Sequence, residues 1–138
     1  IELHFAYRAR QEKKKIILSG SDYLSLFCDR DWLSEAIDNI VKNAFDHTEN
    51  GAVIGITWRA LPSGIQIVVK DNGCGIHPED IHHIFKRFYR SKYSLNTPGI
   101  GLGLPLAKSI IEGQGGLISV QSVLHEGTTF SVSFLTKS

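Results

Sequence analysis

The chain carries the stretch Gly99-Ile100-Gly101-Leu102-Gly103-Leu104, which leads directly into a predicted helix at about residues 101–112. Backbone N–H groups at a helix N-terminus can bind phosphate oxygens, and the helix dipole favours negative charge there. The stretch is not a P-loop, since no Gly-Lys-Ser/Thr follows, and not a dinucleotide fingerprint, since no strand directly precedes it. A flexible hinge is the alternative interpretation, and it is compatible with a phosphate site because a mobile lid needs one.

A second stretch, Asp71-Asn72-Gly73-Cys74-Gly75-Ile76, begins where an alternating apolar strand ends. The ionised carboxylate of Asp71 can accept a hydrogen bond from the exocyclic amine of adenine. The glycines would let the backbone and the purine ring approach closely. Asn-Gly after a strand also indicates a hairpin turn. However, the residues that follow, His77-Pro78-Glu79-Asp80, predict the start of a helix over 81–88 instead of a returning strand.

A third element is a helix that we expect from residue 29 or 31 to about residue 47. Its residues form two stripes roughly 130° apart. The apolar stripe consists of Leu33, Ile37, Ile40 and Ala44, and the polar stripe of Glu35, Asn39, Asn43 and Asp46. The amide oxygens of Asn39 and Asn43 lie one turn apart and suit Mg²⁺, which shares its shell with water and phosphate. A solvated helix edge is the alternative.

The other segments complete an α/β two-layer sandwich, in which about three helices cover one face of a mixed, mostly antiparallel sheet. Strands are expected at 16–18, 24–28, 52–59, 65–70, 117–123 and 128–135, with Phe130, Val132 and Phe134 facing inward. Residues 4–14 have helical character, and we interpret the run Gln11-Glu12-Lys13-Lys14-Lys15 as a solvated, charged end.

Composition predicts a single domain over residues 1–138, with 42% hydrophobic and 21% charged residues. A net charge of +1 gives no reason to expect nucleic acid as a partner. No apolar run approaches the ~18 residues of a membrane span, and no signal peptide is expected at the first residues. Cys28 and Cys74 lie far apart in the chain, so a disulfide is not expected and a reducing compartment fits best.

Two groups of polar residues lie on or beside the predicted helix at 81–88. Three cations could meet a terminal phosphate, although surface cations are usually only solvated: Arg87, Arg90 and Lys92. Three histidines resemble a metal cluster but lack carboxylate spacing, so solvated side chains are the better interpretation: His77, His82 and His83.

Together these motifs resemble the catalytic, ATP-binding domain of sensor histidine kinases, within the superfamily of gyrase, Hsp90, histidine kinases and MutL. Five motifs occur in the family's order over nearly the whole chain. They are the N box at 39–44, the first glycine box at 71–76, the F box at 84–90, the second glycine box at 99–104, and the closing strands with their turn at 115–130. The resemblance implies a Bergerat-type ATP-binding fold.

The resemblance also implies roles for individual residues. Asn43 would be the Mg²⁺ ligand, Asn39 would support the phosphates, Asp71 would bind adenine, and Arg90 would approach the γ-phosphate. The implied catalytic residues are thus Asn39, Asn43 and Arg90. The ATP-binding set also includes Asp71, Gly73, Gly75, Ile76, Tyr89, Lys92, Gly99, Gly101, Leu102, Gly103, Leu104 and Thr129, with residues 88–100 as the ATP lid.

The sequence departs from the family pattern after the metal-binding Asn. The family often has Lys-Tyr where this chain has Asp46-His47, so a phosphate-contacting cation is missing. Lys42 or Lys92 would replace it only imperfectly, which favours weak ATP affinity. Ile100 also stands where a hydroxyl residue is common.

The resemblance implies a catalytic fragment that binds Mg-ATP and donates its γ-phosphoryl group to a histidine on a separate helical dimerisation domain of the same sensor kinase. None of the six histidines lies in the acceptor motif. A response regulator would act downstream, and the fragment would be the cytoplasmic portion of a membrane-anchored parent. One alternative is a gyrase- or Hsp90-type ATPase, which would need a Glu at Asn39. The other is a binding module or an anti-sigma-factor-type serine kinase, which Asp46 keeps open.

Overall fold

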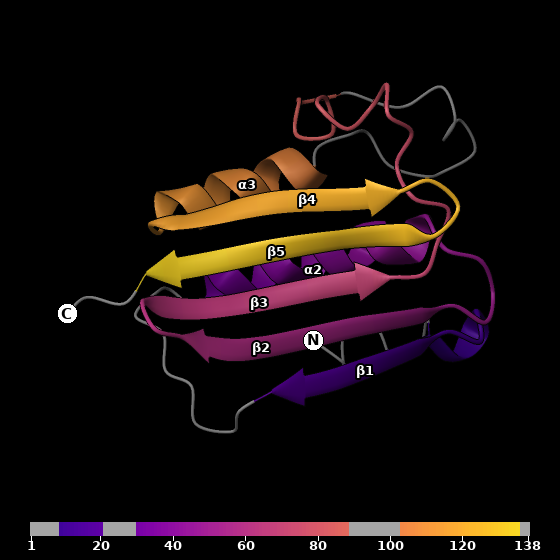
Figure 1. The fold of residues 1–138 in the computed structure, drawn as a ribbon, viewed down its shortest axis with the longest axis horizontal. Helices are drawn as coiled ribbons and strands as arrows, with labels where there is room; N and C mark the ends of the chain where they lie inside the picture. Colours follow the sequence, from indigo (N-terminus) through magenta and orange to yellow (C-terminus); the bar gives the residue numbers. More distant parts are fainter. Residues whose placement is uncertain (1–8, 21–29, 89–102, 136–138) are drawn as a thin grey trace.

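The computed structural model describes residues 9–20, 30–88 and 103–135, and its centre is a five-stranded sheet (Figure 1). The strand order is β1-β2-β3-β5-β4, and only β1 and β2 run parallel. The strands are β1 (Lys15–Gly20), β2 (Val53–Leu61), β3 (Gly64–Asp71), β4 (Gly116–Val123) and β5 (Gly127–Leu135). The predicted mixed, mostly antiparallel sheet is therefore confirmed.

Two helices, α2 (Arg30–Asp46) and α3 (Gly103–Gly113), lie on the same face of the sheet (Figure 1). The apolar stripe predicted for α2 faces the core, where Ile37, Ile40 and Ala44 are buried and Leu33 is half-buried. α2 is helical because this spacing places its large apolar side chains, except the exposed Trp32, on one side. A short helical segment at residues 9–11 is the only other helix in the described part of the chain.

The core lies between the two helices and the inner face of the sheet. Six inward side chains of the three central strands are at most 4% exposed: Ile54, Ile56, Val69, Phe130, Val132 and Phe134. Alternation along β5 predicted the last three correctly, because successive residues of a strand face opposite sides. Truncating a buried aromatic residue such as Phe130 to Ala costs roughly 3–5 kcal/mol.

The helix predicted over residues 81–88 is wrong, because the structure has successive turns over this segment. Each turn closes with an N–H···O bond three residues back, from Asp80 to His77, from His83 to Asp80 and from Lys86 to His83. A helix this short is marginal by itself. Tertiary packing decides its conformation instead, since the Phe85 ring packs edge-on against Phe130, with 6.3 Å between the ring centroids.

The N-terminal helix predicted to continue to residue 14 ends earlier in the structure. Lys13 has a left-handed φ of 54°, a conformation that a helix cannot continue through. The backbone N–H of Lys14 then bonds back to the Ala9 carbonyl at 2.9 Å. The strand predicted at 24–28 lies outside the described residues.

Candidate functional site

Asp71, the last residue of β3, is a carboxylate that is only 6% exposed. Its Oδ1 accepts hydrogen bonds from the backbone N–H groups of Gly73, at 2.9 Å, and Thr128, at 3.3 Å. Burial raises the pKa of the Asp71 carboxyl above its ordinary value, although these two bonds and the nearby His47 oppose the shift. Within the described part of the chain both bonds go to Oδ1, so Oδ2 keeps its capacity to accept a donor from a ligand.

Gly73 and Gly75 are required by the protein's own backbone. A Cβ on Gly73 would lie 2.5 Å from the His47 carbonyl oxygen, at the end of α2. Gly75 has a left-handed φ of 76°, and a Cβ there would collide with the carbonyl of Val123 in β4. We predicted these glycines from the close approach of a purine. The structure shows close approaches of these glycines to His47, directly after α2, and to the start of the β4–β5 turn.

Thr128 lies beside Asp71, whereas the predicted Thr129 lies on the opposite face of the sheet. Thr128 is buried and its Oγ1 is 3.0 Å from Ser122 Oγ. Ser122 Oγ also accepts a bond from the Ile76 N–H at 2.7 Å, which fixes the loop after Asp71. The alternation that places Phe130 inward places Thr128 inward as well, so this pattern was sufficient to choose Thr128 over Thr129.

Asn39 and the start of α3 meet in the structure. Asn39 Nδ2 donates to the Glu35 carbonyl at 3.0 Å, and a Cβ on Gly103 would lie 3.3 Å from Asn39 Oδ1. Asn39 of the N box and Gly103, at the start of α3, are therefore neighbours. The first N–H groups of α3 have no partner within the helix. Leu104, in the same first turn, is half-buried and packs against the core.

Asn43 is half-buried, and its side chain makes no hydrogen bond to the other described residues. One turn further along α2, Asp46 pairs with Lys42 at 3.2 Å. The Asp46 side chain is 8% exposed and that of Lys42 is 51% exposed. The carboxylate that replaces the family's usual lysine is thus neutralised by Lys42, whose ammonium remains open to solvent.

These groups lie along α2, from the start of α3 beside Asn39 to the loop after β3 beside His47, and they can perform three tasks. A buried carboxylate can accept from the amine of a base, amide oxygens can ligate a hard cation, and helix N–H groups can bind phosphate. No cluster of three or more His, Cys, Asp or Glu that could hold a metal occurs in the described ranges. In the same ranges, no helix is long and apolar enough to span a membrane.

Part of the predicted site lies outside the described residues. These are Tyr89, Arg90, Lys92, Gly99, Gly101 and Leu102, with the rest of the expected lid up to residue 100. Arg87 is exposed, with its guanidinium 5.7 Å from the centroid of the Phe88 ring.

A family model described as "Histidine kinase-, DNA gyrase B-, and HSP90-like ATPase" matches residues 28–138. The signal transduction histidine-protein kinase/phosphatase MprB of Mycolicibacterium paratuberculosis is 36% identical over 110 residues, 79% of this chain and 21% of that protein. Sensor protein SrrB of Staphylococcus aureus is 39% identical over 106 residues, 75% of this chain and 18% of that protein. The chain spans about a fifth of the length of these curated relatives.

Solved structures show the same fold. The nucleotide-free catalytic domain of histidine kinase ThkA superposes with a TM-score of 0.84 at 25% identity, covering 97% of this chain and 86% of that chain. A mycobacterial sensor histidine kinase MprB gives a TM-score of 0.82 at 25% identity, covering 98% of this chain and 93% of that chain.

Proposed function

The chain belongs to the family of histidine kinase-, DNA gyrase B- and HSP90-like ATPases, as a sensor histidine kinase catalytic domain, and we propose that it binds Mg-ATP and donates the γ-phosphoryl group to a histidine on a separate helical dimerisation domain of the same protein. The single observation that carries the proposal is the environment of Asp71. Two backbone N–H groups hold its Oδ1, which leaves Oδ2 to accept from the exocyclic amine of adenine.

The residues on α2 fit a Mg²⁺ ion bound together with phosphate. Asn43 has a half-buried amide without a protein partner in the described part of the chain, so its Oδ1 would ligate the ion. Mg²⁺ keeps several waters and relies on substrate phosphates, so one amide ligand is sufficient. Bound there, Mg²⁺ would neutralise charge on the β- and γ-phosphates.

Asn39 has a supporting role in this proposal. Its amide is oriented by the Glu35 carbonyl and faces the start of α3. There it would align the phosphates with the N–H groups at the start of that helix. The lid residues Tyr89, Arg90, Lys92, Gly99, Gly101 and Leu102 complete the proposed site, with Arg90 as the cation for the γ-phosphate.

An ATPase of the gyrase or Hsp90 type is less well supported by the geometry. Asn39 occupies the position of the general base in those enzymes, and an amide cannot take a proton from water. Glu35 lies one turn away on the exposed surface of α2. We therefore expect slow hydrolysis by the isolated domain.

The partners follow from the relatives. Histidine kinase ThkA has been crystallised in complex with the response regulator protein TrrA, and a response regulator is proposed here as the downstream partner. The relatives are sensor kinases, and the segment of this chain that aligns with them is about a fifth of their length. This supports a cytoplasmic catalytic domain within a membrane-anchored sensor kinase.

Calorimetric titration with ATP and GTP, with and without Mg²⁺, tests the binding function. The proposal predicts tighter binding of ATP than of GTP and a gain in ATP affinity on adding Mg²⁺. Equal affinity for both nucleotides would contradict the role of Asp71. An ATP affinity that does not depend on Mg²⁺ would contradict the role of Asn43.

A further inference from the structure

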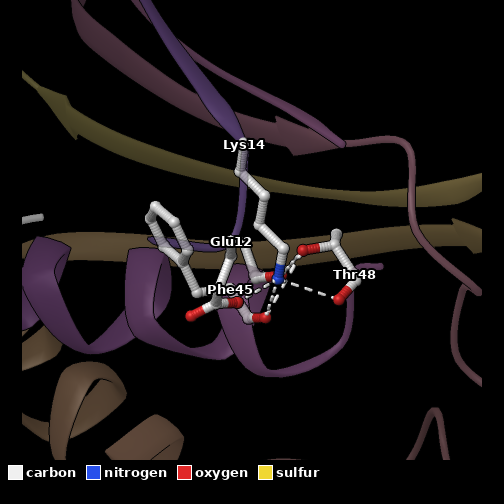
Figure 2. Close-up of polar contacts among 5 residues, drawn as sticks. Glu12, Lys14, Phe45 and Thr48 are labelled. Atoms are coloured by element: carbon white, nitrogen blue, oxygen red, sulfur yellow. Dashed lines mark hydrogen bonds and ion pairs between the residues drawn. The ribbon is translucent and has the colours of Figure 1, made fainter. Parts of the chain in front are cut away.

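Lys14 is a buried cation that the proposed nucleotide chemistry does not use. Its side chain is 2% exposed, and Figure 2 shows the ammonium enclosed by three oxygens. Nζ donates to Glu12 Oε1 at 2.6 Å, to the Phe45 carbonyl at 2.7 Å and to the Thr48 carbonyl at 2.8 Å. All three ammonium donors are therefore used. A buried cation is tolerated only with such pairing.

Two of these oxygens belong to the C-terminal end of α2. Phe45 lies in the last turn, and Thr48 is the second residue after the helix. The last turn has no basic residue and instead contains Asp46, which is unfavourable at the negative end of the helix dipole. Lys14 supplies the missing cation from a segment more than 30 residues earlier in the chain.

The same turn holds the loop that follows Asp71. The carbonyl of His47, between Phe45 and Thr48, accepts a bond from the Cys74 N–H at 3.4 Å. It also lies so close to Gly73 that a Cβ there would be 2.5 Å away. Lys14 thus fixes the carbonyls on both sides of His47, and His47 fixes the loop whose Gly73 N–H orients Asp71.

The segment that carries Lys14 is itself held in place by backbone bonds. The Glu12 carbonyl accepts from the Gly51 N–H at 3.3 Å, and the Lys15 N–H donates to the Ala52 carbonyl at 2.9 Å. Lys14 is consequently anchored on both sides. Its ammonium can act as a fixed point for the end of α2.

We propose that Lys14 is a positioning residue for the base pocket, acting through the Phe45–Thr48 turn on the Gly73–Cys74 loop and so on Asp71. The inference rests on the proposed function, since it assigns the base pocket to Asp71. Loss of the ammonium removes one donor from each of two carbonyls at the end of α2, although Thr48 Oγ1 still donates to the Phe45 carbonyl at 3.4 Å, and the turn relaxes. The displacement of Asp71 weakens only the contact with the adenine base. The affinity should therefore fall by the same factor for every adenine nucleotide.

The test compares Lys14→Met with Lys15→Met, the same substitution at the next residue, which is exposed. Calorimetry with ATP and with AMP is done at a temperature where circular dichroism shows each variant to be folded. Lys14→Met is expected to weaken both nucleotides about tenfold, or ~1.4 kcal/mol, and Lys15→Met to change neither. Unchanged affinity in folded Lys14→Met overturns the proposal. A loss confined to ATP also overturns it, because that places the effect at the phosphates.

Hydrogen exchange separates positioning from general destabilisation. In Lys14→Met the Gly73 and Cys74 amides should exchange faster while β3 and β5 amides such as Val69 and Val132 stay unchanged, whereas a uniform rise across all of them would overturn the proposal. If Lys14→Met does not fold, Lys14→Gln, which keeps two donors, should show the same pattern at smaller size. If the parent chain binds no nucleotide, the proposed function fails, and the exchange measurement still decides whether Lys14 fixes the loop.

Discussion

Replacing Asp71 with Asn changes a hydrogen-bond acceptor in the base pocket into a donor, while the side chain keeps its shape. The N–H groups of Gly73 and Thr128 both point at Oδ1, and an amide NH₂ cannot accept from them. The Asn oxygen must therefore take the Oδ1 position, which forces Nδ2 into the place of Oδ2. The variant presents a donor where the parent presents a charged acceptor.

The magnitude follows from the lost bond. A hydrogen bond to a charged group contributes roughly 1.5–3 kcal/mol, so ATP affinity should fall about 10- to 150-fold. Inosine triphosphate carries a carbonyl oxygen where ATP carries the amine, so Nδ2 can donate to it. Asp71→Asn should therefore reduce or reverse the preference for ATP over inosine triphosphate.

Stability should change in the opposite direction. Burial raises the pKa of Asp71, so the folded protein binds this proton more tightly than the unfolded chain does. Protonated Asp71 therefore stabilises the folded protein at pH values below the ordinary pKa of Asp. This contribution to the free energy of unfolding falls as the pH rises to the raised pKa of the folded state, and it does not change further at higher pH. Asp71→Asn should remove this pH dependence, and at pH 7 it should unfold at the same temperature as the parent or higher.

The assay is calorimetric titration with ATP and inosine triphosphate, together with thermal unfolding between pH 3 and 7. Glu126→Gln, the same acid-to-amide change at an exposed residue of the β4–β5 turn, is the matched control and should change nothing. Asp71→Asn that binds ATP as tightly as the parent would refute the assignment of the base pocket. A weaker nucleotide affinity explained by a lower unfolding temperature would refute the stability argument.

Three further predictions concern the neighbouring residues. Asn43→Ala should make ATP affinity the same with and without Mg²⁺ in a metal titration, and a retained metal effect would place the ion elsewhere. Lys42→Met should lower the affinity for ATP roughly two- to fivefold and leave the affinity for AMP unchanged, because an exposed cation adds little. An equal loss of affinity for both nucleotides would exclude a contact between Lys42 and the phosphates. A higher affinity for ATP would mean that the ion pair with Asp46 opposes binding. Thr128→Val should lower the free energy of unfolding by about 1 kcal/mol through the lost hydroxyl bond, while Thr129→Val should not; denaturant titration would refute this if the two variants were equal.

Local patterns predicted the parts of the fold that depend on one element at a time. The two stripes of α2 follow from helical periodicity, and the position of Asp71 at the end of β3 follows from alternation. The segment at 81–88 failed because its conformation is decided by Phe85 packing on Phe130, a contact that no local pattern contains.

Lys14 shows the same limit more clearly. In the sequence it lies in a charged run that we interpreted as solvated, yet it is buried in the structure. Two of its three partners are the carbonyls of Phe45 and Thr48, and backbone acceptors carry no signature in the sequence. The inward position of Thr128, in contrast, could be predicted from the sequence. Residues two apart on a strand face the same side of the sheet, so Thr128 faces inward if Phe130 does.

Phosphoryl transfer in trans tests the central claim most directly. The chain is mixed with the dimeric helical domain of its own parent protein, Mg²⁺ and ATP labelled at the γ-phosphate. We predict acid-labile label on a histidine of the helical domain, none on the chain alone, and none with Asn43→Ala, because transfer depends on positioning the acceptor in line with the γ-phosphate. Rapid release of free phosphate by the isolated chain, with no label on the helical domain, would contradict the account and indicate an ATPase.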